Sequence, residues 1–161
     1  MKIYKTKLQK VYKIKLDSFE DHRGYYIETY NEKLYSKFKV KFLQDDISVS
    51  KKKVLRGIHG DFKTWKLITC LHGEFHLVVV NNLKNSKDYK KWESFRLTEK
   101  NKLQILIPPG FGNGHQVLTK KAIFHYKQST LYNRKSQFTI NYDSDNFDWP
   151  IKKPILSKRD A

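Results

Sequence analysis

Several residue types are scarce in this sequence of 161 residues, which has one cysteine, four prolines and seven glycines. A single cysteine excludes an intramolecular disulfide, and Cys70 lies in an apolar run, which predicts a small core residue in a reducing compartment. No segment has the length of a membrane span, and the lysine-rich N-terminus lacks the apolar region of a signal peptide. We therefore expect a soluble, cytoplasmic protein with no membrane partner.

Acidic residues are also few. The 33 Lys and Arg against 16 Asp and Glu give a formal net charge of +17. Such a charge attracts nucleic acid, an anionic membrane surface or a phosphorylated small molecule. The lysines are spread along the whole chain and no single stripe dominates, which favours a solvated surface for most of them. A basic β-barrel that binds nucleic acid is kept as an alternative, although we expect no nucleic-acid partner.

Familiar signatures of fixed spacing are missing as well. The sequence has neither a phosphate-binding P-loop nor a Gly-x-Ser-x-Gly elbow, so it gives no support to nucleotide hydrolysis or acyl transfer by those routes. Six histidines are present, but the His-x-His pair with a nearby Glu that is typical of metal-binding cupins is not. We expect no metal, with a metal-dependent cupin isomerase or oxygenase as the alternative.

Short β-like runs fill the chain. They are rich in β-branched and aromatic residues and are separated by Gly, Asn, Asp, Pro or Lys clusters, which predicts an all-β sandwich or barrel. Apolar residues at helical spacing follow only Asn31, so one short helix is expected near residues 31–38. Without repeats or linkers, residues 1–161 should form a single domain. The expected strands are 11–16, 25–30, 66–71, 75–80, 93–97, 103–107, 122–127 and 138–142.

The stretch 54–59, followed by Lys66, places a titratable imidazole between two cations. His59 could accept a proton beside an anionic substrate, because imidazole titrates near neutrality. The alternative is an ordinary histidine on a solvated surface strand. In a regular strand Arg56 and His59 point to opposite faces. A bulge or bend at Gly57 would turn both side chains into the barrel, since glycine inside a strand often marks such a kink.

Tyr126 is the second candidate that the residues themselves suggest. In a regular strand over 122–127, Ala122, Phe124 and Tyr126 share one face. An inward tyrosine needs a partner for its hydroxyl. That partner can be a backbone carbonyl, in which case the residue is structural, or a substrate.

Seven stretches of the chain occur in the order seen in dTDP-4-dehydrorhamnose 3,5-epimerases, and the sequence resembles that family over nearly its whole length. The resemblance implies a cupin-type double-stranded β-helix, or jelly roll, and a homodimer that exchanges strands. It also implies epimerisation of a sugar nucleotide, a 4-keto-6-deoxy sugar linked to a nucleotide diphosphate, with no metal or other cofactor. The matching stretches are residues 21–28, 44–48, 54–59, 109–111, 126–127, 149–150 and 156–160.

Carried over residue by residue, the resemblance assigns four catalytic positions. His59 becomes the base, Asp160 its carboxylate partner, Tyr126 the acid on the opposite face and Lys66 the cation near the keto oxygen. A 4-keto group acidifies the hydrogens on C3 and C5, so removing one leaves an enolate that cations stabilise. The sequence leaves open whether C3, C5 or both are inverted. The implied substrate-binding residues are Arg23, Glu28, Gln44, Asp46, Arg56, Asn113, His115, Gln137 and Arg159.

Some positions depart from the family pattern. Asn113 stands where the family has a binding histidine, and His115 is a new histidine two positions on. Asp61 lies within the stretch where a glutamine often follows the base, and Gln137 replaces a glutamate. These changes favour a substrate other than the dTDP-rhamnose precursor. Similar segments occur in relatives acting on GDP-linked 4-keto-6-deoxy-heptoses for bacterial capsules, so the sequence leaves GDP and dTDP, heptose and hexose, as options.

Overall fold

Strands make up nearly all the regular structure of the computed structural model, which describes all 161 residues. The one α-helix, α1 (Glu32–Tyr35), is capped by the Asn31 side chain and runs into a 3₁₀ turn, Ser36–Phe38. The predicted all-β class and the single short helix near residues 31–38 are therefore confirmed. The strands are β1 (Lys2–Lys5), β2 (Tyr12–Lys15), β3 (Phe19–Asp21), β4 (Gly24–Tyr26), β5 (Gln44–Lys51), β6 (Leu55–Gly60), β7 (Lys66–His72), β8 (Glu74–Asn81), β9 (Trp92–Thr98), β10 (Leu103–Ile107), β11 (Phe111–Val117), β12 (Lys121–Gln128) and β13 (Phe138–Thr139).

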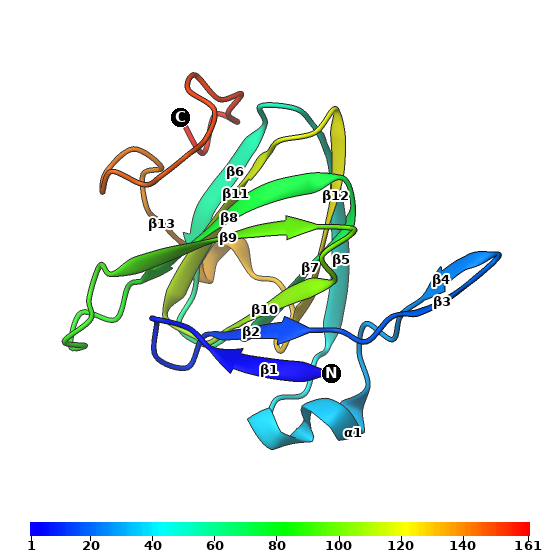
Figure 1. Cartoon of the computed structure of the whole chain (residues 1–161). Helices are drawn as coiled ribbons and strands as arrows, with labels where there is room; N and C mark the ends of the chain where they lie inside the picture. The colour runs from blue at the N-terminus through cyan, green and yellow to red at the C-terminus, as the bar shows by residue number, and fades with distance from the viewer.

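Two antiparallel sheets form the barrel (Figure 1). One has six strands in the order β1-β2-β10-β7-β12-β5, and the other has five in the order β13-β6-β11-β8-β9. Strands far apart in the sequence thus become neighbours, as a jelly roll requires. The hairpin of β3 and β4 belongs to neither sheet and projects away from the barrel (Figure 1).

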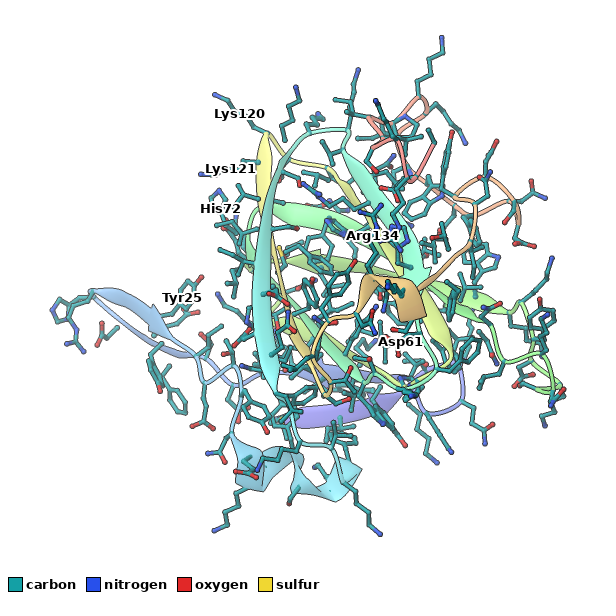
Figure 2. The ribbon with its side chains drawn as sticks, turned by 180° about the vertical axis from the view of Figure 1, so that it is seen from behind. Tyr25, Asp61, His72, Lys120, Lys121 and Arg134 are labelled. Atoms are coloured by element: carbon teal, nitrogen blue, oxygen red, sulfur yellow. The ribbon has the colours of Figure 1, made fainter.

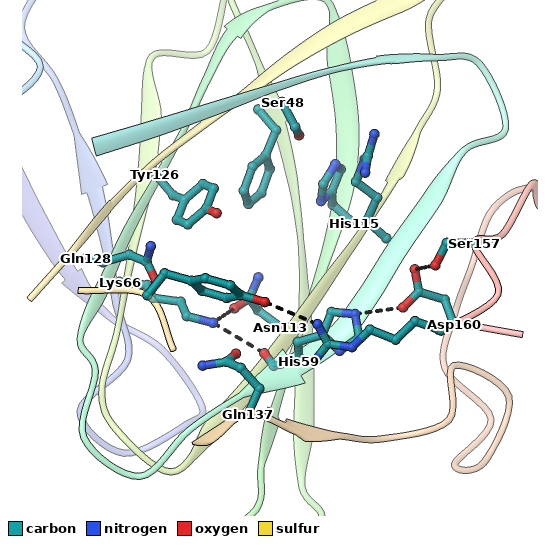
Figure 3. A pocket seen from close by; sticks show the side chains of 14 residues that line it. Ser48, His59, Lys66, Asn113, His115, Tyr126, Gln128, Gln137, Ser157 and Asp160 are labelled. Atoms are coloured by element: carbon teal, nitrogen blue, oxygen red, sulfur yellow. Dashed lines mark hydrogen bonds and ion pairs between the residues drawn. The ribbon is translucent and has the colours of Figure 1, made fainter. Parts of the chain in front are cut away.

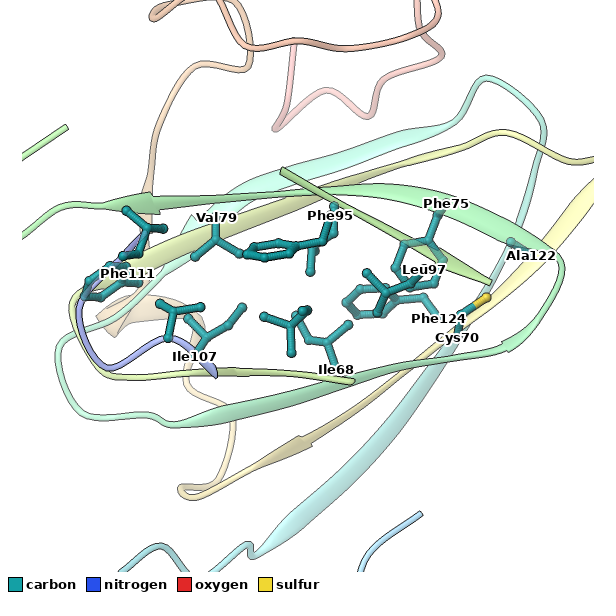
Figure 4. Close-up of a cluster of buried hydrophobic side chains, with 14 of the residues drawn as sticks. Ile68, Cys70, Phe75, Val79, Phe95, Leu97, Ile107, Phe111, Ala122 and Phe124 are labelled. Carbon is teal, nitrogen blue, oxygen red and sulfur yellow. The ribbon is translucent and has the colours of Figure 1, made fainter. Parts of the chain in front are cut away.

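The main core lies between the two sheets (Figure 4). Alternate residues of each strand point inward, so Ile68 and Cys70 of β7 face Phe75, Leu77 and their neighbours from the other sheet. Cys70 is buried, as predicted. This apolar packing fills one part of the barrel interior and leaves the other part free for polar side chains.

Two smaller clusters cover the outer faces of the sheets. Phe147 and Trp149, from the segment after β13, pack against Val78 and Val80 on the back of the five-stranded sheet. Around α1, Tyr35 packs against the six-stranded sheet, where its hydroxyl donates to Gln104. No helix of the structure is long and apolar enough to cross a membrane.

Most lysines are solvated, as expected. Lys120 and Lys121, at the turn into β12, extend away from the barrel (Figure 2). Lys66 and Lys102 are the buried lysines. These two therefore need a specific explanation.

The predicted strands differ from the observed ones at a few places. Regular pairing in the run 25–30 ends at Tyr26, and in the run 138–142 it ends at Thr139. The list omitted β1, β3, β5, β6 and β11. In β11, Gly112 and Gly114 lower the strand propensity. A Cβ at either position would lie less than 3 Å from the Ile58 side chain, so glycine allows β11 to approach β6 closely.

The bulge expected at Gly57 is confirmed. Asn113 pairs with His59 but His115 pairs with Arg56, so one residue of β11 opposes two of β6 between these pairs. Gly57 has φ +112, and a Cβ there would lie 2.6 Å from Gly114 Cα, so only glycine fits. The extra residue shifts the alternation of β6, which brings both Arg56 and His59 to the interior.

Candidate active site

A cavity of about 310 Å³ opens at the polar end of the barrel interior (Figure 3). Only three of the 14 residues that line it are hydrophobic, and both sheets and the C-terminal segment contribute to it. Polar groups that converge on a cavity fix the orientation of a ligand, so a cavity with this many of them suits a polar ligand. The lining residues are Ser48, Arg56, His59, Lys66, Asn113, His115, Phe124, Tyr126, Gln128, Tyr132, Gln137, Ser157, Arg159 and Asp160.

His59 is held at both ring nitrogens. Its Nε2 lies 2.7 Å from Oδ1 of the buried Asp160, whose other oxygen accepts a hydrogen bond from Ser157 Oγ at 2.9 Å. Its Nδ1 lies 3.2 Å from Thr139 Oγ1. Burial and the nearby Arg159 lower the pKa of His59 below 6.5, against the opposing effect of Asp160. At neutral pH the ring is therefore an uncharged base with a fixed orientation.

Lys66 lies on the floor of the cavity with its ammonium group out of contact with any carboxylate. Its Nζ donates to Asn113 Oδ1 at 3.1 Å and to the His59 carbonyl at 3.4 Å. Burial lowers the pKa of Lys66 to about 8. The ammonium is still charged at neutral pH, and it lies beside the backbone of His59.

Tyr126 enters the cavity from β12, on the sheet opposite His59 (Figure 3). Its hydroxyl makes no hydrogen bond within the chain, so the backbone-bonded alternative does not apply. Burial raises its pKa above the usual 10, which keeps the phenol protonated. The hydroxyl is therefore free to donate a hydrogen bond or a proton to a bound ligand.

Two arginines add positive charge to the cavity. Arg56 donates from Nε to Ser50 Oγ at 3.0 Å. The guanidinium of Arg159 lies 3.5 Å from the hydroxyls of both Tyr132 and Thr139. Together with Lys66 they give three cations against the single carboxylate of Asp160, so the cavity attracts an anionic ligand.

His115 lies deeper, on β11. Its ring stacks on Phe124, with centroids 4.0 Å apart and planes at 7°, and only 3% of the residue is exposed. Nε2 has no hydrogen-bond partner, and neither does the buried Ser48 Oγ on the neighbouring wall. Burial, with a further effect of Arg56, lowers the pKa of His115 to about 3. The ring is neutral and leaves unused hydrogen-bonding capacity at the cavity.

Comparison with known proteins identifies the family. The family described as dTDP-4-dehydrorhamnose 3,5-epimerase matches residues 5–161. The chain belongs to this family. It is 36% identical over 168 residues to the dTDP-4-dehydrorhamnose 3,5-epimerase of Shigella flexneri, covering 99% of this chain and 93% of the relative.

Solved structures agree with this assignment to the dTDP-4-dehydrorhamnose 3,5-epimerase family. The enzyme of that name from Elizabethkingia anophelis has a TM-score of 0.91 and 39% identity, with 99% of this chain and 93% of that chain covered. The 3,5-epimerase from Legionella pneumophila, solved with dTDP-4-keto-L-rhamnose, has a TM-score of 0.94 and 33% identity, with 99% and 89% covered. The predicted jelly roll is thereby confirmed.

Nine of the thirteen predicted site residues line the cavity, and two more lie just behind its wall. Gln44 and Asp46 pair along β5 with Gln128 and Tyr126 of β12. Gln44 Nε2 and Gln128 Nε2 both donate to Asp46 Oδ2, at 2.7 and 3.0 Å. They support the wall that presents Tyr126. The nine lining residues are His59, Lys66, Tyr126, Asp160, Arg56, Asn113, His115, Gln137 and Arg159.

Arg23 and Glu28 were expected in the same site, and the structure of the single chain does not bring them to it. Arg23 lies at the tip of the projecting hairpin, where it pairs with Asp21 at 2.5 Å and is exposed. Glu28 follows the hairpin and is also exposed. Neither lines the cavity, because β3 and β4 pair only with each other and lead the chain away from the barrel (Figures 1 and 2).

Two departures from the family pattern turn out to be bonded to each other. Gln137 Nε2 donates to Asp61 Oδ2 at 2.7 Å, although the residues are 76 positions apart. Sequence reasoning had noted Asp61 only as a substitution, and it missed Thr139 and Ser157, which hold the His59–Asp160 pair. For Ser157 a local signal existed, since it lies three residues before Asp160 in a turn closed by a bond from Asp160 N to Ser157 O.

Proposed function

We propose that this protein is a nucleotide-sugar epimerase that inverts C3, C5 or both of a nucleotide diphosphate-linked 4-keto-6-deoxy sugar, for bacterial surface polysaccharide synthesis. The observation that carries the proposal is the oriented pair of His59 and Asp160, 2.7 Å apart, facing a free phenol across a cationic cavity. Family membership supports the reaction class.

The base acts through a fixed tautomer. Asp160 engages Nε2, so Nδ1 is the nitrogen that accepts the proton from the carbon next to the keto group, and the Thr139 hydroxyl, 3.2 Å from Nδ1, must turn its hydrogen away first. As the imidazolium forms, the buried carboxylate stabilises it. Neither step requires His59 to move.

The enolate that results carries its charge on the C4 oxygen, and Lys66 is the group placed to stabilise it. Asn113 Oδ1 accepts a hydrogen bond from the Lys66 ammonium, and this bond orients the remaining N–H groups. Inversion then needs a proton from the other face of the sugar. Tyr126 supplies it from the opposite sheet, since its phenol is protonated and unbonded.

The diphosphate is the group that best matches the remaining charge. Arg56 and Arg159 present guanidinium groups, which bind phosphate oxygens in a bidentate manner. Gln44 and Asp46, behind the wall, and Gln137, at its rim, complete the polar surroundings on the nucleotide and sugar sides. His115 adds a neutral hydrogen-bonding nitrogen.

For the nucleotide we propose dTDP and a hexose, because the relatives named above are dTDP-sugar enzymes. They give no support to the GDP-linked heptose. Asn113 and His115 still differ from the family pattern at the cavity wall, so the GDP-linked heptose is the second substrate to test. Relatives carry both 3,5-epimerase and 3-epimerase names, so the test must follow C3 and C5 separately.

We further propose that the enzyme works as a homodimer in which the hairpin enters the partner. Phe19 and Tyr26 of the hairpin are each 66% exposed, and β5 is an open sheet edge with Ile47 exposed. Exposed edges and apolar patches of this kind usually mark interfaces. In such a dimer the partner subunit's Arg23 and the partner subunit's Glu28 would reach the substrate.

Subunit mixing tests this dimer. Arg23→Ala and His59→Asn should each be inactive alone. A refolded mixture should regain about a quarter of the wild-type activity, because half of the dimers are mixed and each has one intact site. No recovery in a mixture that is dimeric by light scattering would contradict the exchange of Arg23.

The reaction itself is tested in deuterated water. Purified protein is incubated with dTDP- and GDP-linked 4-keto-6-deoxy sugars, and NMR follows deuterium at C3 and C5. We expect incorporation with the wild type and none with His59→Asn. A variant that still exchanges would exclude His59 as the base, and no exchange by the wild type with any of these sugars would exclude the function.

Two alternatives have their own outcomes. A metal-dependent cupin would contain stoichiometric metal and lose activity on chelation, whereas the structure brings no group of three or more His, Cys, Asp or Glu together. A nucleic-acid-binding barrel would bind oligonucleotides through its surface lysines, with strong salt dependence and no effect of His59→Asn.

A further inference from the structure

Two carboxylates are buried in this protein, Asp160 and Asp61. Asp160 has His59 as a cationic partner when the ring is protonated. Asp61 has no cation within ion-pair distance. Its charge is instead held by three N–H donors at 2.7 Å each: the backbone amides of Lys63 and Thr64 on Oδ1, and the Gln137 side chain on Oδ2.

Such a carboxylate is built to stay ionised. Three hydrogen bonds to the charged form outweigh burial, so the pKa of Asp61 lies below its usual value. The amides that bind it follow β6 directly, and the catalytic candidate His59 is two residues before it. The chain thus keeps a permanent negative charge just behind the floor of the cavity.

A buried cation without an ion pair lies at the same floor. The Lys66 ammonium contacts two neutral oxygens, from Asn113 and from the His59 backbone. Asp61 is buried as well, and it is the acid that opposes the effect of burial on the pKa of Lys66, whereas Arg159 adds to that effect. His59 is the other titratable group whose pKa responds to Lys66. Asp61 is outside the cavity lining, but Gln137 connects it to the lining.

We propose that Asp61 is a positioning residue of the active site: it is the counter-charge to the buried Lys66 ammonium, and its bond to Gln137 fixes that amide at the cavity rim. Asp61 touches no substrate in this arrangement. It acts through Lys66, whose charge stabilises the enolate. The effect of Asp61 on the reaction rate rests on the proposed function, whereas its effect on the charge of Lys66 does not.

The carboxylate and the amide at positions 61 and 137 can be altered by substitution while the hydrogen bond between the two side chains is kept. In Asp61→Asn the Gln137 amide can rotate, so that its oxygen accepts from the new Asn amide; the bond is kept and the charge is lost. In Asp61→Asn with Gln137→Glu, both bond and charge are kept, with the charge moved to position 137. The two variants therefore differ in charge alone.

The direct test is the titration of Lys66 in the protein without substrate. Lysine side chains labelled at the ε position are followed by NMR, and Lys66→Arg assigns the signal. In Asp61→Asn we expect the Lys66 pKa to fall by about one unit from its wild-type value. The double variant should return it to near the wild-type value, and Asp88→Asn, which removes an acid paired with Lys91 instead, should leave it unchanged.

A folded Asp61→Asn in which Lys66 titrates as in the wild type would overturn the proposal. If Asp61→Asn does not fold, the double variant decides: a near wild-type Lys66 pKa supports the proposal, and a fall of one unit overturns it. In the exchange assay, Asp61→Asn should move the alkaline limb of kcat/KM down by the same shift, with recovery in the double variant. Because the NMR titration needs no substrate, failure of the proposed reaction leaves its result unaffected.

Discussion

His59 and His115 lie on paired strands and line one cavity, yet the structure gives them different chemistry. Burial and a neighbouring arginine lower the pKa of both rings. His59 has partners at both nitrogens, including the carboxylate of Asp160, whereas His115 stacks on Phe124 and leaves Nε2 unbonded. Burial alone makes an imidazole too weak a base to accept a proton. A carboxylate partner is what retains its basicity.

Removing the carboxylate of Asp160 should have the largest effect, because it takes away the partner that distinguishes His59 from His115. Asp160→Asn should lower kcat/KM by about 10³-fold, since the buried carboxylate sets the tautomer and stabilises the imidazolium. Asp160 also raises the pKa of His59, so the acid limb of the pH profile should move to lower pH. Rates measured from pH 5 to 9 check both. An acid limb that moves to higher pH would contradict the role of Asp160.

A change at Tyr126, the proposed acid on the opposite wall, should separate proton exchange from inversion. Tyr126→Phe should reduce formation of the epimer by about 10²-fold, while His59 still removes the proton. Deuterium should therefore continue to enter the unepimerised substrate. Parallel loss of exchange and inversion in a folded Tyr126→Phe variant would show that Tyr126 does more than donate a proton.

The pH profile of the wild-type activity should report on His59 through its acid limb and on Lys66 through its alkaline limb. Activity should fall on the acid side, where His59 becomes protonated at a pH below the usual range of a histidine, and above about 8, where Lys66 loses its charge. Tyr126 adds no limb in this window because its pKa is raised. The profile of kcat/KM reports these groups in the free enzyme. A profile that is flat between pH 7 and 9.5 would exclude Lys66 as the charged group.

The smallest effect is expected at the second histidine. His115→Phe keeps the stack on Phe124 and removes an unbonded buried nitrogen, so it should raise the free energy of unfolding by about 1 kcal/mol. Its catalytic cost should be an increase in KM with little change in kcat. Chemical denaturation and steady-state kinetics check the two parts, and an unchanged KM would remove His115 from the substrate contacts.

The same variant should change the acid stability. The unfolded state binds a proton at His115 near pH 6.5 and the folded state only near pH 3. The wild type therefore loses up to ~1.4 kcal/mol per pH unit from this group as the pH falls through that window. His115→Phe should flatten that slope. Equal slopes for the two proteins would mean that His115 takes up a proton in the folded state.

Local pattern predicted part of this site and long-range pairing supplied the rest. Strand alternation and one glycine were enough to predict the bulge at Gly57 and the shared direction of Arg56 and His59. No local signal connects His59 to Asp160, about a hundred positions later; only the family resemblance did. The bond between Asp61 and Gln137 depends on β13 pairing with β6, which neither segment reveals alone.

The hairpin of β3 and β4 shows where prediction from a motif fails to place a residue. Arg23 was assigned to the substrate from a motif, but a motif does not say in which subunit its residues act. The solvated lysines were predicted correctly because exposure needs no partner. Lys66 and Lys102 are the exceptions. The burial of Lys66 follows from the inward alternation of β7, which can be read from the sequence only when the inward face of that strand is known.

The bulge at Gly57 also decides which side chains of β6 point into the barrel. Along β6 the side chains alternate inward and outward, and the extra residue skips one step between Arg56 and His59. A substitution at position 57 that restored regular pairing would change no catalytic group. It would nevertheless turn either His59 or Arg56 toward the outside, so the polar lining of this cavity depends on the bulge, in which two residues of β6 lie opposite the single residue Gly114 of β11.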